Sequence, residues 1–105
     1  MSQKPETLFR KRVRKILLPY EQSGQIVTLS QQQVALCGYP DLVFSVGGKF
    51  WAWELKKDAK SPATKLQLHM LEKINKSGAY AAVVHPDNFE VELTLLLKQI
   101  GEKND

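Results

Sequence analysis

Apolar residues at helical spacing mark the two ends of the chain. From Pro5 to about Leu18 and from Asp87 to about Ile100, apolar positions recur every three or four residues, which predicts two amphipathic helices. The apolar stripes consist of Phe9, Val13, Ile16 and Leu17 in the first helix and of Phe89, Leu93, Leu96, Leu97 and Ile100 in the last. Pro19 and the Ser23–Gly24 pair are expected to end the first helix.

Four segments between these helices have the pattern of β-strands. Gln25 to Ser30 is short and rich in β-branched residues. Asp41 to Val46 and Lys49 to Leu55 are apolar and aromatic, and Gly47–Gly48 between them permits the positive φ angles of a tight hairpin turn. Ala79 to Val84 is almost continuously apolar, which is typical of a strand covered on both faces and predicts a central place in the sheet.

A second helix is predicted between the hairpin and the last strand. Ser61 is expected as its N-cap, Pro62 as its first helical residue and Gly78 as the residue after its last turn. The order helix, strand, hairpin, helix, strand, helix is that of an α/β protein. Because no repeat, low-complexity tract or linker interrupts residues 1–105, we expect a single domain.

The composition is typical of a small intracellular protein. With 105 residues, 43% of them apolar, the chain can form one hydrophobic core but is too short for a separate recognition module. The single Cys37 excludes an internal disulfide and a zinc site built from several cysteines. Since the sequence has neither a membrane-length apolar run nor a secretory leader, we expect an intracellular, cytoplasmic protein with no membrane partner.

Positive charge is concentrated near the N-terminus. The formal net charge is +4, and six cations lie between Lys4 and Lys15 against Glu6 alone, whereas residues 87–105 carry five acids and two lysines. Such an uneven distribution favours a polyanionic partner such as a phosphate backbone. A basic helix face is equally well explained by solubility.

The second strand of the hairpin carries the residues of greatest chemical interest. Alternation along this strand places Glu54 and Lys56 on one face, together with Phe50 and Ala52, and places Trp51, Trp53 and Leu55 on the other. The two tryptophans are therefore expected in the core and not as base-stacking platforms. Asp41 opens the partner strand, so pairing across the turn would bring its carboxylate beside Glu54.

Two carboxylates flanked by an ammonium suit the hydrolysis of phosphodiesters. The repulsion between adjacent carboxylates is relieved by a hard divalent cation, which also activates water and polarises a phosphoryl group. A lysine beside the cation can orient the water and offset developing negative charge. The alternative is that Glu54 and Lys56 are simply the charged end of a strand and that Asp41 is a loop residue.

The segments GYPDLVF and FWAWELK resemble the PD-(D/E)xK nuclease signature, with Pro40–Asp41 and Glu54–Leu55–Lys56 in the matching places. Residues 38–84 are most similar to the virus-type replication-repair nuclease (VRR-NUC) branch, which is similar to Holliday junction resolvases. This resemblance implies a restriction-endonuclease-like fold, with a mixed central β-sheet flanked by α-helices. It also implies DNA hydrolysis with Mg²⁺ or Mn²⁺, often by a homodimer.

The resemblance assigns roles to individual residues. Asp41, Glu54 and the Leu55 carbonyl would bind the metal, while Lys56 and Gln67 would set the attacking water. Gln67 lies on the apolar stripe of the second helix with Met70, Leu71, Ile74 and Gly78, so its amide needs a buried partner unless it is an exposed residue at the edge of the stripe.

Glu6 matches an accessory metal ligand that family members often carry in the first helix. The competing interpretation is a carboxylate that stabilises the helix N-terminus. His69 and His85 have no partners at metal-ligand spacing, so neither is expected to be catalytic.

The function expected from these features is structure-selective cleavage of DNA, in particular of branched DNA such as Holliday junctions. The protein is expected to act inside a cell, and a phage is one possible source of its gene. The expected DNA-contacting cations are Arg10, Lys11, Arg14 and Lys57. Val91 and Leu95 lie outside the main stripe of the last helix, where they would line a dimer interface or be buried within one chain. Alternatives are a non-catalytic DNA-binding or assembly subunit, a flap or nicking nuclease, and an RNA-directed nuclease.

Overall fold

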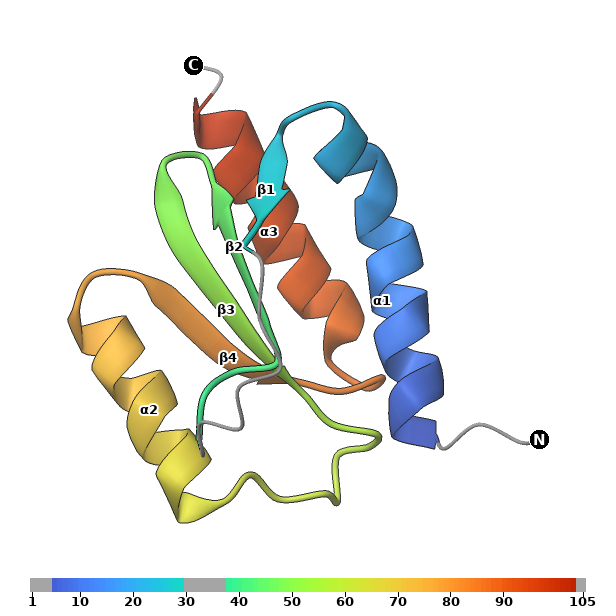
Figure 1. Ribbon diagram of the computed structural model, residues 1–105, viewed down its shortest axis with the longest axis vertical. Coiled ribbons are helices and arrows are strands. Elements are labelled where there is room, and N and C mark those ends of the chain that lie inside the picture. The colour runs from blue at the N-terminus through green and yellow to red at the C-terminus, as the bar shows by residue number, and fades with distance from the viewer. Residues whose placement is uncertain (1–4, 30–37, 104–105) are drawn as a thin grey trace.

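A computed structural model describes residues 5–29 and 38–103 as a four-stranded sheet with three helices (Figure 1). The elements are α1 (Pro5–Gln22), β1 (Ile26–Thr28), β2 (Leu42–Val46), β3 (Lys49–Leu55), α2 (Lys65–Lys76), β4 (Tyr80–Val84) and α3 (Phe89–Lys103). Their order confirms the predicted one. Among the described residues, no helix has both the length and the apolar character needed to cross a membrane.

The sheet is mixed, as predicted. Its strand order is β1-β2-β3-β4, with antiparallel pairing in the first two steps and parallel pairing between β3 and β4. Helices α1 and α3 cover one face, and α2 packs on the other beside β4 (Figure 1). The α/β class with a mixed sheet between helices is therefore confirmed.

The β2–β3 hairpin turns through Gly47 and Gly48, whose φ angles are +56° and +77°. Side chains are disfavoured at these angles, which is why the turn needs glycine. At Gly47 there is also no room, because a Cβ atom would lie 2.5 Å from the backbone oxygen of Gln99 in α3. The turn therefore fixes the hairpin register and holds it against α3.

The larger part of the core lies between the sheet and the two helices α1 and α3. Trp53 is completely buried there and makes edge-to-face contacts with Phe44 and Phe89, at ring-centroid distances of 5.5 and 6.0 Å. Trp51 is also buried on this face, so the prediction that both tryptophans belong to the core is confirmed. On the opposite face, the small side chain of Ala52 leaves room for Leu71 of α2.

Three predictions were wrong: the end of the first helix, the start of the second helix and the place of β4 in the sheet. Pro19 does not end the first helix: α1 continues to Gln22, because the missing N–H removes one hydrogen bond while the next turn still closes from Ser23 N to Pro19 O (3.0 Å). Tyr20, which follows Pro19, packs on the core and helps to retain that turn.

The second helix starts three residues later than predicted. Its N-cap is Thr64 and not Ser61, because Thr64 and Gln67 form a reciprocal capping box that satisfies two backbone donors. Pro62 lies outside the helix, whereas Gly78 follows its end with a φ angle of +98°, as predicted.

In the described part of the chain, β4 is an edge strand, paired with β3 alone, and not the predicted central strand. Its apolar run reflects cover by helices on both faces, which an edge strand of a parallel pair also needs. Ser30, the predicted end of the first strand, and Cys37 lie outside the described residues.

Candidate active site

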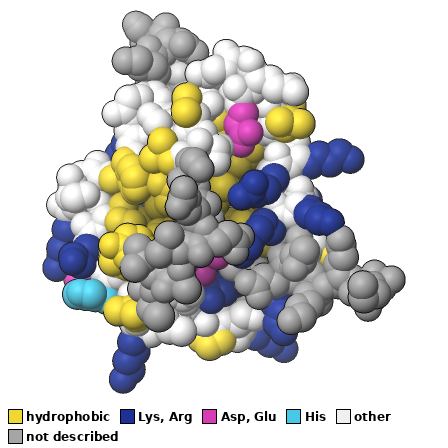
Figure 2. Space-filling view, viewed as in Figure 1, with side chains coloured by type: hydrophobic (Ala, Val, Ile, Leu, Met, Phe, Trp, Pro, Cys, Tyr) yellow, Lys and Arg dark blue, Asp and Glu magenta, His cyan; other side chains and the backbone are white. Residues whose placement is uncertain are grey.

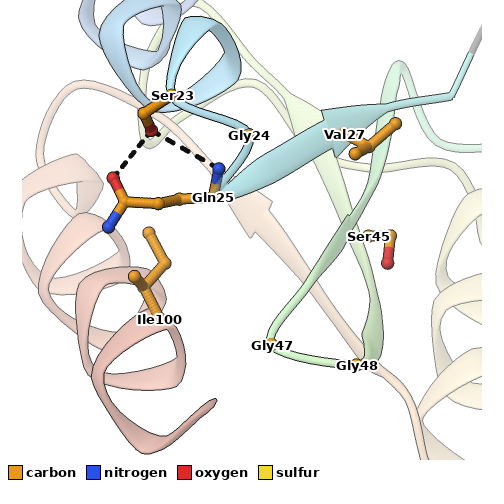
Figure 3. Close-up of a pocket in the computed structure, with 8 residues that line it drawn as sticks. All are labelled: Ser23, Gly24, Gln25, Val27, Ser45, Gly47, Gly48 and Ile100. Carbon is orange, nitrogen blue, oxygen red and sulfur yellow. Dashed lines mark hydrogen bonds between the residues drawn. The ribbon is translucent and has the colours of Figure 1, made fainter. Parts of the chain in front are cut away.

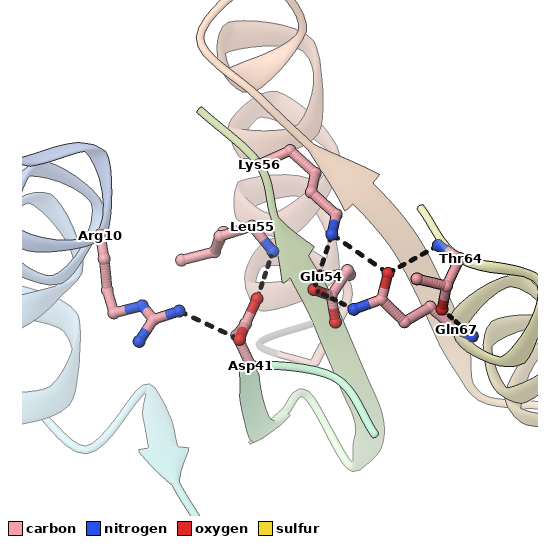
Figure 4. A network of polar contacts seen from close by, with 7 residues as sticks. All are labelled: Arg10, Asp41, Glu54, Leu55, Lys56, Thr64 and Gln67. Carbon is pink, nitrogen blue, oxygen red and sulfur yellow. Dashed lines mark hydrogen bonds and ion pairs between the residues drawn. The ribbon is translucent and has the colours of Figure 1, made fainter. Parts of the chain in front are cut away.

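The open end of the β2–β3 hairpin holds the candidate site. Leu42 of β2 pairs with Trp53 of β3, so Asp41 comes opposite Glu54 at the next step of the ladder. The backbone N–H of Leu55 donates to Asp41 Oδ2 over 2.9 Å and fixes the carboxylate beside the strand (Figure 4). The hairpin thus places the two predicted carboxylates at one end of the sheet.

Glu54 is the most unusual residue of the site. It is a buried carboxyl group, with only 3% of its surface exposed. Its Oε2 atom accepts a hydrogen bond from Gln67 Nε2 (3.1 Å) and lies 3.7 Å from Lys56 Nζ. Its Oε1 atom is buried and has no hydrogen-bond partner among the described residues. An unsatisfied buried carboxyl oxygen is costly unless another group binds it.

The surroundings of Glu54 favour its protonated form when no metal is bound. Burial is the main cause, followed by the adjacent Asp41 carboxyl group, and together they raise the pKa of Glu54 from 4.5 to about 8. Lys56 acts in the opposite direction and lowers it. Two adjacent carboxyl groups that are difficult to ionise together are a good site for a divalent cation.

Gln67 connects this site to the start of α2. Its Oε1 atom accepts hydrogen bonds from Lys56 Nζ (3.1 Å) and from the backbone N–H of Thr64 (2.8 Å), while Nε2 donates to Glu54. The amide is half-buried and has the partners that its position on the apolar stripe required. One side chain therefore caps α2 and orients both Glu54 and Lys56.

Arg10 of α1 also reaches the site, which the sequence did not indicate. Its Nη2 atom donates to Asp41 Oδ1 over 3.0 Å, and the Arg10 and Asp41 side chains are 39% and 24% exposed. Arg10 was predicted only as a DNA contact. The available signal was its position next to the buried Phe9, at the border of the apolar stripe.

The other predicted cations are exposed. Lys11 and Arg14 lie on the outer side of α1, and Lys57 follows Lys56 beyond the end of β3. Figure 2 shows Lys and Arg side chains, in dark blue, gathered over the part of the surface formed by α1. These side chains are accessible to a polyanion.

The oxygen atoms of the site fit a hard divalent cation. Asp41 and Glu54 supply carboxylates, and one Glu54 oxygen is buried without a partner among the described residues. Carboxylate and carbonyl oxygens are the ligands that Mg²⁺ and Mn²⁺ prefer. Among the described side chains, no three His, Cys, Asp or Glu residues form a cluster. The side chain of Glu6, the predicted accessory ligand, lies outside the described residues.

The two histidines are placed away from the carboxylates by the fold. His69 is exposed on α2, and His85 follows β4, where its backbone N–H donates to Asn88 Oδ1 over 2.8 Å. A pocket of about 400 Å³ lies at the hairpin turn, at the other end of β2 and β3 (Figure 3). None of the described residues that line it is titratable.

The fold and the site define an α/β protein of the PD-(D/E)xK type, with the acidic residues at the open end of a hairpin and the lysine two residues after the glutamate. No protein-family model and no curated protein matches the chain. A solved structure described as a VRR_NUC domain is similar to it, with a TM-score of 0.62 and 26% identity over 79% of this chain and 86% of that one. The chain has a VRR-NUC nuclease fold, which confirms the predicted resemblance and points to a nuclease.

Proposed function

We propose that this protein is a divalent-metal-dependent endonuclease that cleaves DNA in a structure-selective manner. The observation that carries the proposal is the polar network in which Asp41, Glu54, Lys56 and Gln67 meet at one end of the sheet (Figure 4). A strand exit that merely carried charge would leave Glu54 in solvent. Here the carboxyl group is buried and one of its oxygens has no hydrogen-bond partner in the described part of the chain, which is a cost that a metal ion would remove.

Asp41, Glu54 and the Leu55 carbonyl would hold Mg²⁺ or Mn²⁺. When bound, the ion supplies an activated water and a polarised phosphoryl oxygen. Lys56 provides a positive charge that is fixed by Gln67 and Glu54, so it is ready to stabilise the negative charge that develops on the phosphate. The Gln67 amide holds the Lys56 ammonium group and the Glu54 carboxyl group in fixed positions relative to each other.

DNA binding would use the exposed cations near this end of the fold. Lys11, Arg14 and Lys57 are accessible to phosphates, and such binding depends on salt rather than on sequence. We further propose that branched DNA is the preferred substrate and that two copies of the chain act together. One chain holds one such site, and incision of both strands of a junction requires two.

The dimer proposal is supported by exposed apolar residues on α3. Val91 is 62% exposed and Leu95 is 38% exposed, so neither is buried within one chain. Closed two-fold dimers are the commonest soluble oligomers, and these residues would lie in the interface of such a dimer.

The proposal is tested with a cleavage panel of duplex, nicked, flapped and four-way DNA in Mg²⁺ or Mn²⁺, followed by cleavage with Asp41→Asn, Glu54→Gln and Lys56→Ala. Each variant is expected to lose activity by a factor on the order of a hundred or more. Glu72→Gln is the matched control, because Glu72 is an exposed carboxylate on α2 that pairs only with Lys76 among the described residues. If the wild type bound DNA in a salt-dependent manner but did not cleave it, the proposed nuclease activity would be refuted. The alternative of a non-catalytic DNA-binding subunit would then be favoured.

A further inference from the structure

The ion pair between Arg10 and Asp41 joins two elements that are distant in sequence. Arg10 lies in α1 and Asp41 precedes β2, yet Nη2 and Oδ1 are 3.0 Å apart. A charge-assisted hydrogen bond of this kind is among the stronger polar contacts in proteins, and it is only partly exposed to solvent here. The contact therefore affects which other cations can approach Asp41.

Arg10 binds one of the two oxygen atoms of the Asp41 carboxylate. Oδ1 accepts from Arg10 and Oδ2 accepts from the Leu55 backbone N–H. On the neighbouring residue, Glu54 Oε2 accepts from Gln67, and Oε1 is the oxygen without a partner among the described residues. A divalent cation that binds Asp41 through Oδ1 must therefore displace Arg10 or share that oxygen atom with a guanidinium of like charge.

We propose that Arg10 is a built-in competitor for the metal ion at Asp41 and that a DNA phosphate releases it. This inference rests on the proposed metal-dependent nuclease function. A guanidinium group matches a phosphate as well as it matches a carboxylate, because its donors form the same planar fork toward both anions. The Arg10 side chain is 39% exposed, so a bound backbone can reach it without opening the core. Metal binding and DNA binding then support each other, and the protein binds the metal ion weakly until substrate is present.

The proposal predicts that removing Arg10 tightens metal binding when DNA is absent. Mn²⁺ is titrated by calorimetry into the wild type, Arg10→Gln and Lys11→Gln, at one pH and low salt. We expect Arg10→Gln to bind Mn²⁺ roughly fivefold more tightly, which corresponds to about 1 kcal/mol and to the upper range for a partly exposed ion pair. Lys11→Gln removes one charge from the adjacent, exposed position of α1, so it measures the general electrostatic effect and is expected to leave the affinity almost unchanged.

Release by phosphate is measured through the coupling between DNA and metal. The affinity for a labelled duplex is determined by fluorescence anisotropy in EDTA and in Ca²⁺, with a gel to show that the duplex is intact. Because binding coupling is reciprocal, the increase in DNA affinity caused by Ca²⁺ equals the increase in Ca²⁺ affinity caused by DNA. With Ca²⁺ also titrated into both proteins without DNA, we expect this increase to be smaller in Arg10→Gln than in the wild type by the same factor that separates their DNA-free Ca²⁺ affinities.

Two results would overturn the proposal. Mn²⁺ binding to Arg10→Gln that is no tighter than binding to Lys11→Gln would show that Arg10 does not compete, and an unchanged coupling in Arg10→Gln would show that DNA does not release it. Thermal melting checks that each variant is folded, and Arg10→Lys, which keeps the charge but loses the planar fork, gives a second test with an expected intermediate affinity. If the wild type bound no metal and cut no DNA, the proposed function would be wrong instead.

Discussion

Replacing Glu54 by glutamine should stabilise the metal-free protein at alkaline pH. In the folded chain, burial and the neighbouring Asp41 carboxyl raise the pKa of Glu54 from 4.5 to about 8. The folded state thus holds a proton that the unfolded state releases above its ordinary pKa. Stability from this group is complete below pH 4.5 and is lost progressively as the pH rises to about 8.

The size of the effect follows from the gap between the two pKa values. At about 1.36 kcal/mol per pKa unit, a gap from 4.5 to about 8 sets an upper limit of about 5 kcal/mol. Below that limit, we expect Glu54→Gln to gain roughly 2 to 4 kcal/mol at pH 8 and almost nothing at pH 4.5. For a domain of about this size, such a gain raises the melting temperature by roughly 10 °C or more.

The assay is urea unfolding in EDTA at several pH values between 4.5 and 8, with Glu72→Gln as the control for loss of an exposed carboxylate. The wild type and the control should lose stability together as the pH rises, and Glu54→Gln should not. Parallel curves for all three proteins would refute the reasoning. Adding Mg²⁺ at pH 8 should stabilise the wild type much more than Glu54→Gln, because the variant keeps only one of the two carboxylates that would bind the ion.

Three further predictions concern the amide, the DNA face and the oligomer. Gln67→Ala should lower the cleavage rate at least tenfold. Thr64→Ala should lower the unfolding free energy by about 1 kcal/mol with little loss of cleavage rate, because it removes only the helix cap. Equal losses of cleavage rate in the two variants would refute a role for the Gln67 amide. Lys11→Ala with Arg14→Ala should lower the slope of log affinity against log salt by about 0.9 for each phosphate that is no longer neutralised, and an unchanged slope would move the DNA face away from α1. Sedimentation should give a dimer that Val91→Glu dissociates; a wild-type monomer that nicks one strand of a junction would favour a flap or nicking activity.

Local patterns in the sequence were sufficient to bring together the residues of the candidate site at the end of β3. The alternation along β3 and the two glycines of the turn place Glu54 and Lys56 on one face and bring Asp41 opposite them. These features depend on neighbouring residues and on turn geometry, which operate over a few positions of the chain. The inward position of Gln67 also followed from helical spacing alone.

The limits of the second helix were also encoded locally, although the predicted start was wrong. Thr64 and Gln67 form the T-x-x-Q pattern of a capping box, which outweighs the Ser61–Pro62 pair as a start signal. Both side chains accept hydrogen bonds from backbone N–H groups at the start of the helix, Gln67 from Thr64 and Thr64 from Gln67. The capping box is therefore the feature of the sequence that locates this helix.

Other features were decided only by the tertiary structure. An apolar run shows that β4 is covered on both faces, but not whether a further strand pairs with it, because strand order depends on contacts distant in sequence. The persistence of α1 through Pro19 depends on the packing of Tyr20 against the core. Arg10 has the pattern of any helix-surface cation, and its ion pair with Asp41 exists because the fold brings together residues that are 31 positions apart. Periodicity records which side of an element is buried, whereas the partner of a polar group is set by how those elements pack.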